Sequence, residues 1–379
     1  MSGIFDIAII GGGIAGASLA YFVAPHRSVV LFEQETALGY HATGRSAAEY
    51  TRRFHSPAVG RLTDASYDFL TTPPEGFTET PLLHRRGNLL IAGHEKAKIF
   101  ERTFAYENEN PPQNGSPIRR LTVEEAVEMV AFLDSDYVYG AFFDPDCWDI
   151  EVENLLQGYA KGARKQGAEF RNSSKVETVT RKQDHWEIRD GERIARARMV
   201  VNAAGAWVDP VAVLCGVPGL GIVPHRRTAI NVKVSGHDLS NMPEVNEIEE
   251  DFYFKPDAGQ LFVSPADETP MEPHDAWADE MDIAYAAHYL TECTTLEITH
   301  VAHSWAGLRT FAPDRLPVVG FSEAVPGFFW FAGQGGFGIQ TSPALGQLAA
   351  AALTGSDLPE NLMAAGVDVA GFLPSRFGA

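Results

Sequence analysis

Apolar runs alternate with stretches of helical spacing along most of this chain. At the start, an apolar run at residues 7–10 is followed by a glycine-rich segment at 11–16, a helix-forming stretch and a second apolar run at 29–32. Short apolar runs bounded by turn residues are typical of buried strands. The pattern therefore predicts a strand, a glycine turn, a helix and a second strand.

The last part of the chain repeats this order. Residues 328–332 predict a strand, 333–338 a glycine turn, and 340–353 a helix. A helix that begins directly after a glycine turn offers free backbone N–H groups and the positive end of its dipole. Both ends of the chain thus predict turns that receive negative charge.

The middle of the chain adds helices and strands. Apolar spacing predicts a helix at 121–130, capped by Thr122, and an amphipathic helix at 151–167. Strand patterns occur at 175–180, 186–189 and 198–202. The last of these runs ends in small residues, which let a loop pass close to a nucleotide but are equally common in plain tight turns.

Residues 222–300 follow a different pattern, in which β-branched and aromatic positions alternate with polar ones. The clearest strands are predicted at 228–234, 252–255 and 261–264. Alternation of this kind is typical of an antiparallel sheet. The predicted fold class is α/β: a doubly wound Rossmann-type domain with an inserted α+β domain built on a mostly antiparallel sheet.

Composition narrows the range of partners. The chain has 379 residues, of which 45% are hydrophobic and 21% charged, as in an ordinary globular protein. Its formal net charge of −20 argues against nucleic acid or an anionic membrane as a partner. No apolar run approaches the roughly 18 residues of a membrane span, and we expect neither stable membrane insertion nor export.

Cysteine usage points to a reducing compartment. Cys147, Cys215 and Cys293 are widely separated and form no CxxC pair. This arrangement predicts neither a disulfide framework nor a zinc site, and no metal is expected. A cytoplasmic location fits.

The first glycine segment has the spacing of a dinucleotide-binding turn. Gly11 allows a tight turn, Gly13 lets the backbone approach a pyrophosphate, and Gly16 lets the helix pack closely on the strand. Glu33 follows the second apolar run, where a carboxylate accepts the hydroxyls of an adenosine ribose. A glycine-rich turn without a ligand is the alternative, but the flanking strands and the acid favour a dinucleotide.

Five motifs that occur in order resemble the D-amino-acid oxidase and glycine oxidase family of FAD-dependent amine oxidoreductases. They are residues 11–16 with Glu33, 44–48, 201–207, 305–320 and 335–338. Within the family, residues 40–46, 252–257 and 338–342 look most like the bacterial D-arginine dehydrogenases. The resemblance implies an FAD-binding domain at 1–85, 145–220 and 309–379, and a substrate-binding domain at 86–144 and 221–308.

The resemblance also implies noncovalent FAD and the residues that hold it. They are Gly11, Gly13, Ile14, Ala15, Gly16, Glu33, Gln34, Thr43, Gly44, Arg45, Ser46, Ala48, Val176, Ala204, Gly205, Trp207, Gly335, Gly336, Gly338, Ile339, Gln340 and Thr341. His41 lies in a loop that carries the flavin covalently in some relatives similar to dimethylglycine dehydrogenase. Close relatives with noncovalent FAD share a similar segment, so we expect no covalent bond.

The implied activity is oxidative deamination of a D-amino acid, in which a hydride passes from the α carbon to flavin N5. The imino acid then gives a keto acid and ammonia. Arg309 is the candidate carboxylate clamp, since a guanidinium binds a carboxylate through two parallel hydrogen bonds, and Tyr253 adds a hydroxyl. Gly336 supplies backbone groups to the amine and to the flavin, with Gln340 beside it. A structural ion pair for Arg309 and a half-buried strand position for Tyr253 are the plain alternatives.

Other chemistries stay open. Oxidation of an N-substituted or cyclic amino acid of the sarcosine, opine or proline type uses the same geometry. A non-enzymatic FAD subunit is disfavoured by the pair Tyr253 and Arg309. The electron acceptor is a quinone, an electron carrier or O2. No cysteine lies near Arg309, so the cysteinyl flavin linkage of the sarcosine-oxidase branch is not expected. Residues 261–264 lack the lysine with which that branch activates oxygen, and Lys255 lies earlier, so the resemblance favours a dehydrogenase over an oxidase.

The candidate substrate pocket consists of Thr51, Phe54, Asn88, Arg226, Glu244 and Asn246. Asn88 and Phe54 align with the cation-binding glutamate and the lid tyrosine of D-arginine dehydrogenases, which weakens the case for a guanidinium substrate. Glu244 and Asn246 could restore a cation partner. Arg226 and the neighbouring Arg227 could contact substrate, but ion pairs with carboxylates of this acidic protein are the favoured interpretation of both.

Four arginines make this edge of the protein locally basic. They are Arg52, Arg53, Arg85 and Arg86. Solvated loop charge is the plain interpretation. The alternative is a substrate with an acidic side chain.

Overall fold

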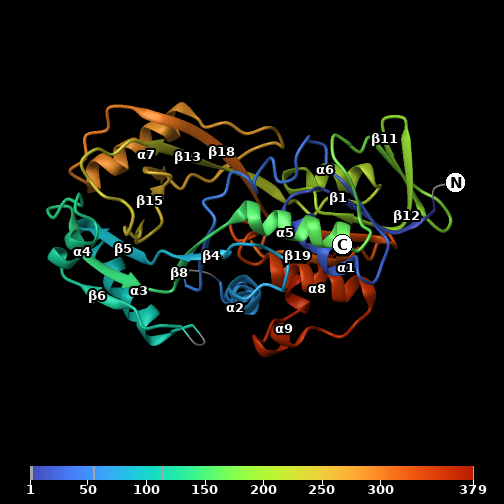
Figure 1. Cartoon of the computed structure of the whole chain (residues 1–379), viewed down its shortest axis with the longest axis horizontal. Helices are drawn as coiled ribbons and strands as arrows, with labels where there is room; N and C mark the ends of the chain where they lie inside the picture. The colour runs from blue at the N-terminus through green and yellow to red at the C-terminus, as the bar shows by residue number, and fades with distance from the viewer. Residues whose placement is uncertain (1–2, 54–55, 113–114, 379) are drawn as a thin grey trace.

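The computed structural model describes residues 3–53, 56–112 and 115–378 (Figure 1). An eight-stranded sheet forms one end of the molecule, and a nine-stranded sheet forms the other. The N-terminal and C-terminal segments, drawn blue and red, lie together at the first of these ends. Segments distant in sequence therefore build one layer.

The eight-stranded sheet has a parallel centre. Its strands are β1 (Phe5–Ile10), β2 (Val29–Phe32), β9 (Glu169–Arg171), β10 (Thr178–Arg181), β11 (Trp186–Asp190), β12 (Arg193–Asn202), β19 (Val318–Phe321) and β20 (Phe328–Ala332). The order is β10-β11-β12-β1-β2-β9, and β20 joins the end of β12 and carries β19. The pairs β12–β1, β1–β2, β2–β9 and β12–β20 are parallel, as expected where helices connect the strands.

The nine-stranded sheet is mostly antiparallel, as the alternating pattern predicts. Its strands are β5 (Asn88–Gly93), β6 (Arg119–Leu121), β7 (Val138–Asp144), β13 (Val223–Val232), β14 (Glu244–Glu247), β15 (Tyr253–Asp257), β16 (Gln260–Ser264), β17 (Thr269–Pro270) and β18 (Val301–Phe311). One pair, β5 with β14, is parallel. A third, small sheet contains β3 (Glu49–Thr51), β4 (Leu83–Arg85) and β8 (Cys147–Ile150).

Helices cover both sheets. They are α1 (Ile14–Val23), α2 (Pro57–Thr71), α3 (Ala97–Glu109), α4 (Val123–Met129), α5 (Val152–Lys165), α6 (Val208–Leu214), α7 (Glu280–Cys293), α8 (Ser342–Thr354) and α9 (Glu360–Ala364). Thr122 caps α4 in a capping box, as predicted, and accepts a hydrogen bond from the Glu125 amide at 3.2 Å. Within the described chain, no helix combines the length and apolar character needed to cross a bilayer.

Alternation along β1 explains how the first sheet buries both faces. Ile7 and Ile9 join the core that contains Leu345 of α8, whereas Ala8 and Ile10 join the core on the opposite face. Successive side chains of a strand point to opposite faces. An unbroken apolar run is therefore required, and each fully buried Ile or Leu contributes about 1.5–3 kcal/mol.

The structure departs from the predicted elements in three places. Strand β12 begins at Arg193, before the predicted start at 198, and β10 begins at Thr178, so that residues 175–177 form a loop. Helix α7 interrupts the segment predicted as strands alone. Its buried residues Ala286, Leu290 and Cys293 are too few to stand out, although the spacing is helical and Asp279 caps the helix.

Candidate active site

A cavity of about 640 Å³ lies where several parallel strands end. It is lined by residues that directly follow β1, β2 and β12, among them Gly11, Glu33 and Ala203. The carboxyl ends of parallel strands meet at one edge of a sheet, which is where open α/β sheets bind their ligands. Its volume is in the range of small-molecule and cofactor sites.

The glycine turn after β1 leaves no room for side chains. Gly11 has φ +112°, and a β-carbon there would lie 2.3 Å from the carbonyl oxygen of Ala203. A β-carbon on Gly16 would lie 1.9 Å from the Gly11 oxygen. Gly11 lines the cavity, while Gly16 serves the close packing of α1 on the turn.

Glu33 closes the wall of the cavity at the end of β2. One carboxylate oxygen accepts the Gly12 amide at 2.8 Å and the other accepts the Glu35 amide at 2.9 Å. Burial raises the pKa of this carboxyl, and the two amides oppose the rise. A fixed acceptor beside a bare glycine turn and a helix N-terminus fits the ribose and pyrophosphate of a dinucleotide.

Most of the predicted cofactor residues line this cavity. They are Gly11, Gly13, Ile14, Ala15, Glu33, Gln34, Thr43, Arg45, Ser46, Val176, Ala204, Gly205, Trp207, Gly335, Gly336, Gly338 and Ile339. Gly16, Gly44 and Thr341 line neither this cavity nor the second one described below, and Ala48 and Gln340 line only the second. The Thr341 hydroxyl donates to the Phe337 backbone oxygen at 2.7 Å. This side chain therefore faces the turn before α8 rather than the cavity.

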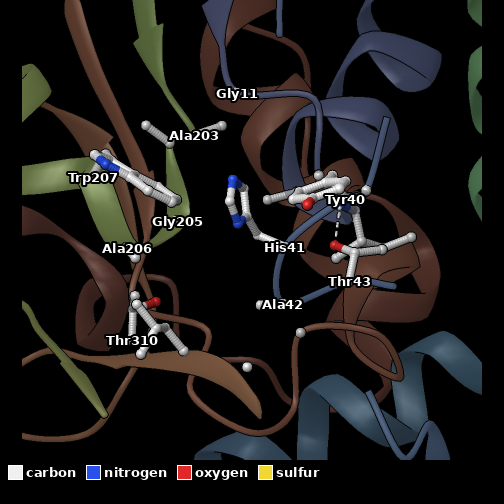
Figure 2. Close-up of a pocket in the computed structure, with 18 of the residues that line it drawn as sticks. Gly11, Tyr40, His41, Ala42, Thr43, Ala203, Gly205, Ala206, Trp207 and Thr310 are labelled. Carbon is white, nitrogen blue, oxygen red and sulfur yellow. Dashed lines mark hydrogen bonds between the residues drawn. The ribbon is translucent and has the colours of Figure 1, made fainter. Parts of the chain in front are cut away.

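The loop after β2 places His41 in the middle of the cavity wall. In Figure 2 the His41 ring projects toward Trp207, and the two ring centres are 4.6 Å apart. His41 Nε2 is 3.0 Å from a Glu35 carboxylate oxygen. The Arg45 guanidinium is engaged with the protein, since it donates to the Ala276 oxygen at 2.7 Å.

A second cavity, of about 330 Å³, adjoins the first. The residues that line both cavities are Ser46, Ala47, Arg227, Tyr253, Arg309, Gly336 and Ile339. Arg309 and Tyr253 thus lie at the junction, on β18 and β15. The two candidate catalytic side chains, which come from separate strands, are brought together with the glycine turn before α8.

Arg309 is enclosed by protein but accessible from both cavities. No carboxylate in the described part of the chain lies within ion-pair distance of its guanidinium, and no described residue hydrogen-bonds to the Tyr253 hydroxyl. Burial lowers the pKa of Arg309, and the nearby Arg227 guanidinium lowers it further. A cation without a counter-ion beside an open hydroxyl is suited to bind a carboxylate.

The prediction that Arg226 lines the pocket is wrong. Its guanidinium pairs with Asp282 at 2.7 Å and with Asp267 at 3.5 Å, and it lies on neither cavity. The next residue, Arg227, lines both cavities and pairs with Glu268 at 3.3 Å. Neighbouring residues of β13 face opposite sides of the sheet, so a shift of one position moves a side chain from the cavity to the face covered by α7.

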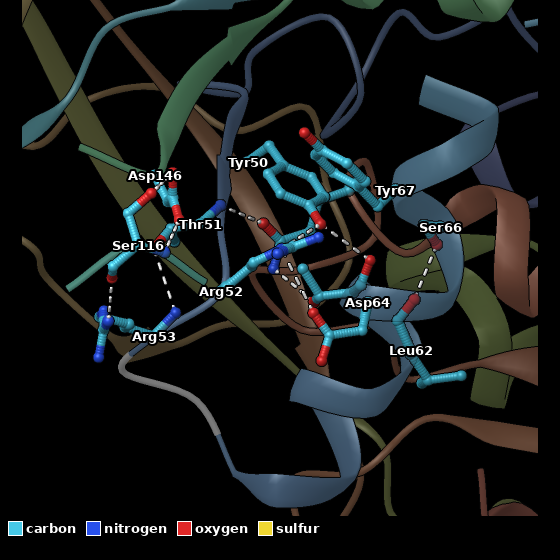
Figure 3. A network of polar contacts seen from close by, with 12 residues as sticks. Tyr50, Thr51, Arg52, Arg53, Leu62, Asp64, Ser66, Tyr67, Ser116 and Asp146 are labelled. Atoms are coloured by element: carbon cyan, nitrogen blue, oxygen red, sulfur yellow. Dashed lines mark hydrogen bonds and ion pairs between the residues drawn. The ribbon is translucent and has the colours of Figure 1, made fainter. Parts of the chain in front are cut away.

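The four arginines near the pocket bind groups of the protein. Arg53 pairs with the buried Asp144 at 3.1 Å and with Glu107 at 3.3 Å. Arg52 pairs with Asp64 at 3.3 Å, as Figure 3 shows. Arg86 pairs with Asp149 at 2.5 Å, and Arg85 donates to the Pro145 oxygen at 3.1 Å. None of these four arginines lines either cavity. Arg85 is exposed, but Arg52, Arg53 and Arg86 are largely buried in ion pairs, so the interpretation as solvated loop charge is wrong for these three.

The other predicted pocket residues divide as follows. Thr51, Asn88, Glu244 and Asn246 line the second cavity, and Phe54 lies outside the described residues. The Gln340 amide accepts the Thr51 backbone N–H at 3.0 Å and donates to Thr63 at 3.1 Å. Glu49 also lines the second cavity and was missed. Nothing in the local sequence marks Glu49 as a pocket residue, and only the three-dimensional structure places it there.

Lys255 lies outside both cavities. Its ammonium group donates to Asp149 at 2.8 Å and to the Ala47 oxygen at 2.5 Å. It is therefore committed to the protein interior.

Comparison with known proteins agrees with this architecture. The family model described as "FAD dependent oxidoreductase" (DAO) matches residues 6–352. Glycine oxidase of Geobacillus kaustophilus is 24% identical over 355 residues, which cover 91% of this chain and 92% of that protein. Mitochondrial dimethylglycine dehydrogenase of Homo sapiens is 26% identical over 365 residues. That match covers 88% of this chain but only 40% of the longer human protein.

Solved structures share the whole fold. Glycine oxidase from Geobacillus kaustophilus superposes with a TM-score of 0.83 at 23% identity, and 99% of each chain is covered. L-proline dehydrogenase from P. horikoshii has a TM-score of 0.81 at 22% identity, with 100% of this chain and 99% of that one covered. The predicted α/β fold class is confirmed. With a family match over most of its length and a cavity that fits the dinucleotide, the chain belongs to the DAO family of FAD-dependent oxidoreductases.

Proposed function

We propose that this protein oxidises an α-amino acid, with the substrate carboxylate bound by Arg309 and Tyr253. The observation that carries the proposal is the enclosed Arg309 guanidinium, which has no counter-ion among the described residues and faces the junction of the two cavities. A bidentate contact with a carboxylate supplies the missing charge. FAD, when bound in the larger cavity, supplies the hydride acceptor.

In this proposal, residues of the chain orient the substrate. Arg309 and Tyr253 hold the carboxylate, and the turn at Gly336 faces the amine. With two groups fixed, one enantiomer aims its α hydrogen at the cofactor. We assign the D form, as the resemblance to D-amino-acid oxidases and D-arginine dehydrogenases implies.

Oxidation of an N-substituted or cyclic amino acid is the second candidate. It is favoured by the names of the relatives, which include a dimethylglycine dehydrogenase, a 4-methylaminobutanoate oxidase and an L-proline dehydrogenase. The same carboxylate clamp would serve these substrates.

Anaerobic reduction of the flavin tests the proposal. The purified holoenzyme is mixed with D-amino acids, their L forms, sarcosine, dimethylglycine and proline, and bleaching of the flavin absorbance is followed. We expect the D-amino acids to reduce the flavin fastest. Faster reduction by sarcosine, dimethylglycine or proline supports the second candidate, and no reduction by any of them overturns both.

The proposal extends to the class of electron acceptor. We propose a dehydrogenase rather than an oxidase, because Lys255 donates a hydrogen bond to Asp149 and lies outside both cavities. It is therefore not placed to activate O2 there. Turnover with an artificial quinone acceptor should then exceed turnover with O2. Equal rates with O2 would overturn this assignment.

A further inference from the structure

The second cavity has an acidic wall opposite the substrate clamp. Its carboxyl-bearing residues are Glu49, Glu244, Glu247, Glu249 and Glu250, whereas its cationic residues are Arg227 and Arg309. Both arginines belong to the junction with the larger cavity. Glu247 and Glu249 pair with Lys96, whereas Glu49 and Glu244 form no ion pair with any described residue.

Two parallel strands present this wall. Glu244 of β14 pairs in register with Asn88 of β5, and Asn246 pairs with Leu90. Side chains two residues apart share a face of a sheet, and all four of these residues line the cavity. The Asn246 amide donates to the Asn88 amide oxygen at 3.0 Å, which leaves Asn88 occupied by the protein.

Glu244 is buried without a hydrogen-bond donor. The residue is 0% exposed, and neither carboxylate oxygen has a hydrogen-bond partner in the described part of the chain. One ligand oxygen each from Glu49 and Glu244 and the Cys147 sulfur lie within 4.8 Å of one another. An unpaired buried carboxyl of this kind costs stability unless it is protonated or meets a cation.

The neighbouring charges do not balance this pair. Asp149 already holds the two cationic side chains of the cluster, Arg86 at 2.5 Å and Lys255 at 2.8 Å. Three carboxyl groups thus face two cations, so the cluster lacks one positive charge or one proton. Burial raises the pKa of Glu244, and the adjacent Glu49 raises it further, whereas Lys255 opposes the rise.

A metal ion is a poor occupant of this position. The Cys147 thiol donates to a Glu49 oxygen at 2.9 Å, and burial together with the two carboxyls raises its pKa. A cysteine must lose its proton and become a thiolate before it can ligate a metal. An organic cation, in contrast, needs only carboxylate acceptors.

We propose that Glu49 and Glu244 bind the cationic end of the substrate side chain, so that the substrate is a basic amino acid with an ammonium or guanidinium group. This inference rests on the proposed function, because Arg309 must hold the carboxylate at the other end. On binding, the cation supplies the positive charge that the three carboxyl groups lack. The alignment of Asn88 with a cation-binding glutamate argued against such a substrate, but the required carboxylates come from two other strands.

D-lysine and D-norleucine provide the test, since they differ in the terminal ammonium group. The limiting rate of anaerobic flavin reduction divided by the apparent Kd is measured for each. We expect the wild type to prefer D-lysine by about tenfold or more. In Glu244→Gln and in Glu49→Gln the preference for D-lysine over D-norleucine should vanish. Glu128→Gln, an exposed site on α4, controls for the lost charge.

A binding measurement separates this inference from the proposed function. 5-Aminovalerate has the carboxylate and the terminal ammonium but no α-amine, and valerate lacks both amines. We expect 5-aminovalerate to perturb the flavin spectrum of the wild type at lower concentration than valerate, and Glu244→Gln to abolish the difference. Equal binding of the two acids, or a wild type that prefers D-norleucine, overturns the inference. A flavin that no amino acid reduces, with 5-aminovalerate still favoured, overturns the proposed function alone.

Discussion

Gly336 lies directly against the guanidinium of Arg309: a β-carbon on Gly336 would approach Arg309 Nη1 to 3.0 Å. The glycine turn before α8 and the carboxylate clamp on β18 are thus one contact surface. A side chain at position 336 would displace the guanidinium or fill the space for the substrate. The absence of a side chain there is part of the site.

Replacement of Arg309 should be the most damaging single change for a carboxylate substrate. Arg309→Met is expected to cost about 2–5 kcal/mol in kcat/KM, because a charge-assisted contact is lost and the substrate carboxylate stays unpaired. Tyr253→Phe should cost less, about 1–2 kcal/mol, as for a single hydrogen bond to a charged group. Steady-state kinetics per bound flavin measure both.

Arg226→Met is the matched control for the clamp. It removes an arginine from the same sheet whose ion pairs are with Asp267 and Asp282, outside both cavities. We expect kcat/KM per bound flavin to change little. A loss equal to that of Arg309→Met would contradict the assignment of the clamp.

Glu33 should govern retention of FAD. Glu33→Ala removes the acceptor of the Gly12 and Glu35 amides and the partner of the ribose. We expect a larger Kd for FAD in equilibrium titration, with the reduction rate of fully loaded enzyme little changed. Glu169→Ala, at an exposed strand position, should retain FAD like the wild type. A collapse of the rate per bound flavin would refute the ribose role.

The flavin should be bound without a covalent link. The His41 ring nitrogen Nε2 is 3.0 Å from a Glu35 carboxylate oxygen, and the cavity is lined by glycine turns that offer backbone groups to a ligand. Acid precipitation should therefore leave a colourless pellet and a yellow supernatant, measured by absorbance. Flavin that remains with the pellet would refute this prediction.

Arg53 should matter for stability and not for substrate. Arg53→Met leaves the fully buried Asp144 without its 3.1 Å partner, and loss of one member of a buried ion pair costs about 3–5 kcal/mol. Denaturant unfolding should show this loss. If kcat/KM per bound flavin fell by a similar factor with stability unchanged, Arg53 would be a substrate contact after all.

The buried Glu244 predicts a pH dependence of stability. Burial raises its pKa from the ordinary value of 4.5, so above that pH the unfolded chain releases a proton that the folded protein keeps. The unfolded state then binds fewer protons, and stability falls as the pH rises toward the pKa of the folded state. Glu244→Gln removes this loss.

The measurement is the Tm of the two proteins across the pH range. The Tm of Glu244→Gln relative to the wild type should rise as the pH increases above the ordinary glutamate pKa of 4.5. Glu128→Gln should show no such trend. A constant difference across this range would mean that Glu244 ionises at an ordinary pH.

Local features of this protein could be predicted from its sequence. The β1–α1–β2 unit, the capped helix α4 and the glycine turn before α8 each depend on residues close together in the chain. Turn geometry, capping and apolar periodicity act over a few residues, so their signals are contiguous. The dinucleotide site follows because the strand ends carry the glycines and Glu33 themselves.

Only the tertiary structure decided what the second cavity contains. Glu49 and Glu244 meet because β3 and β14 belong to different sheets that pack together, and no local pattern encodes that contact. The choice between Arg226 and Arg227 depends on the register of β13 against β18, where a shift of one residue reverses every side chain. The sequence by itself thus determined the family, the cofactor and the candidate clamp, whereas long-range strand packing decided which charges line the candidate substrate cavity.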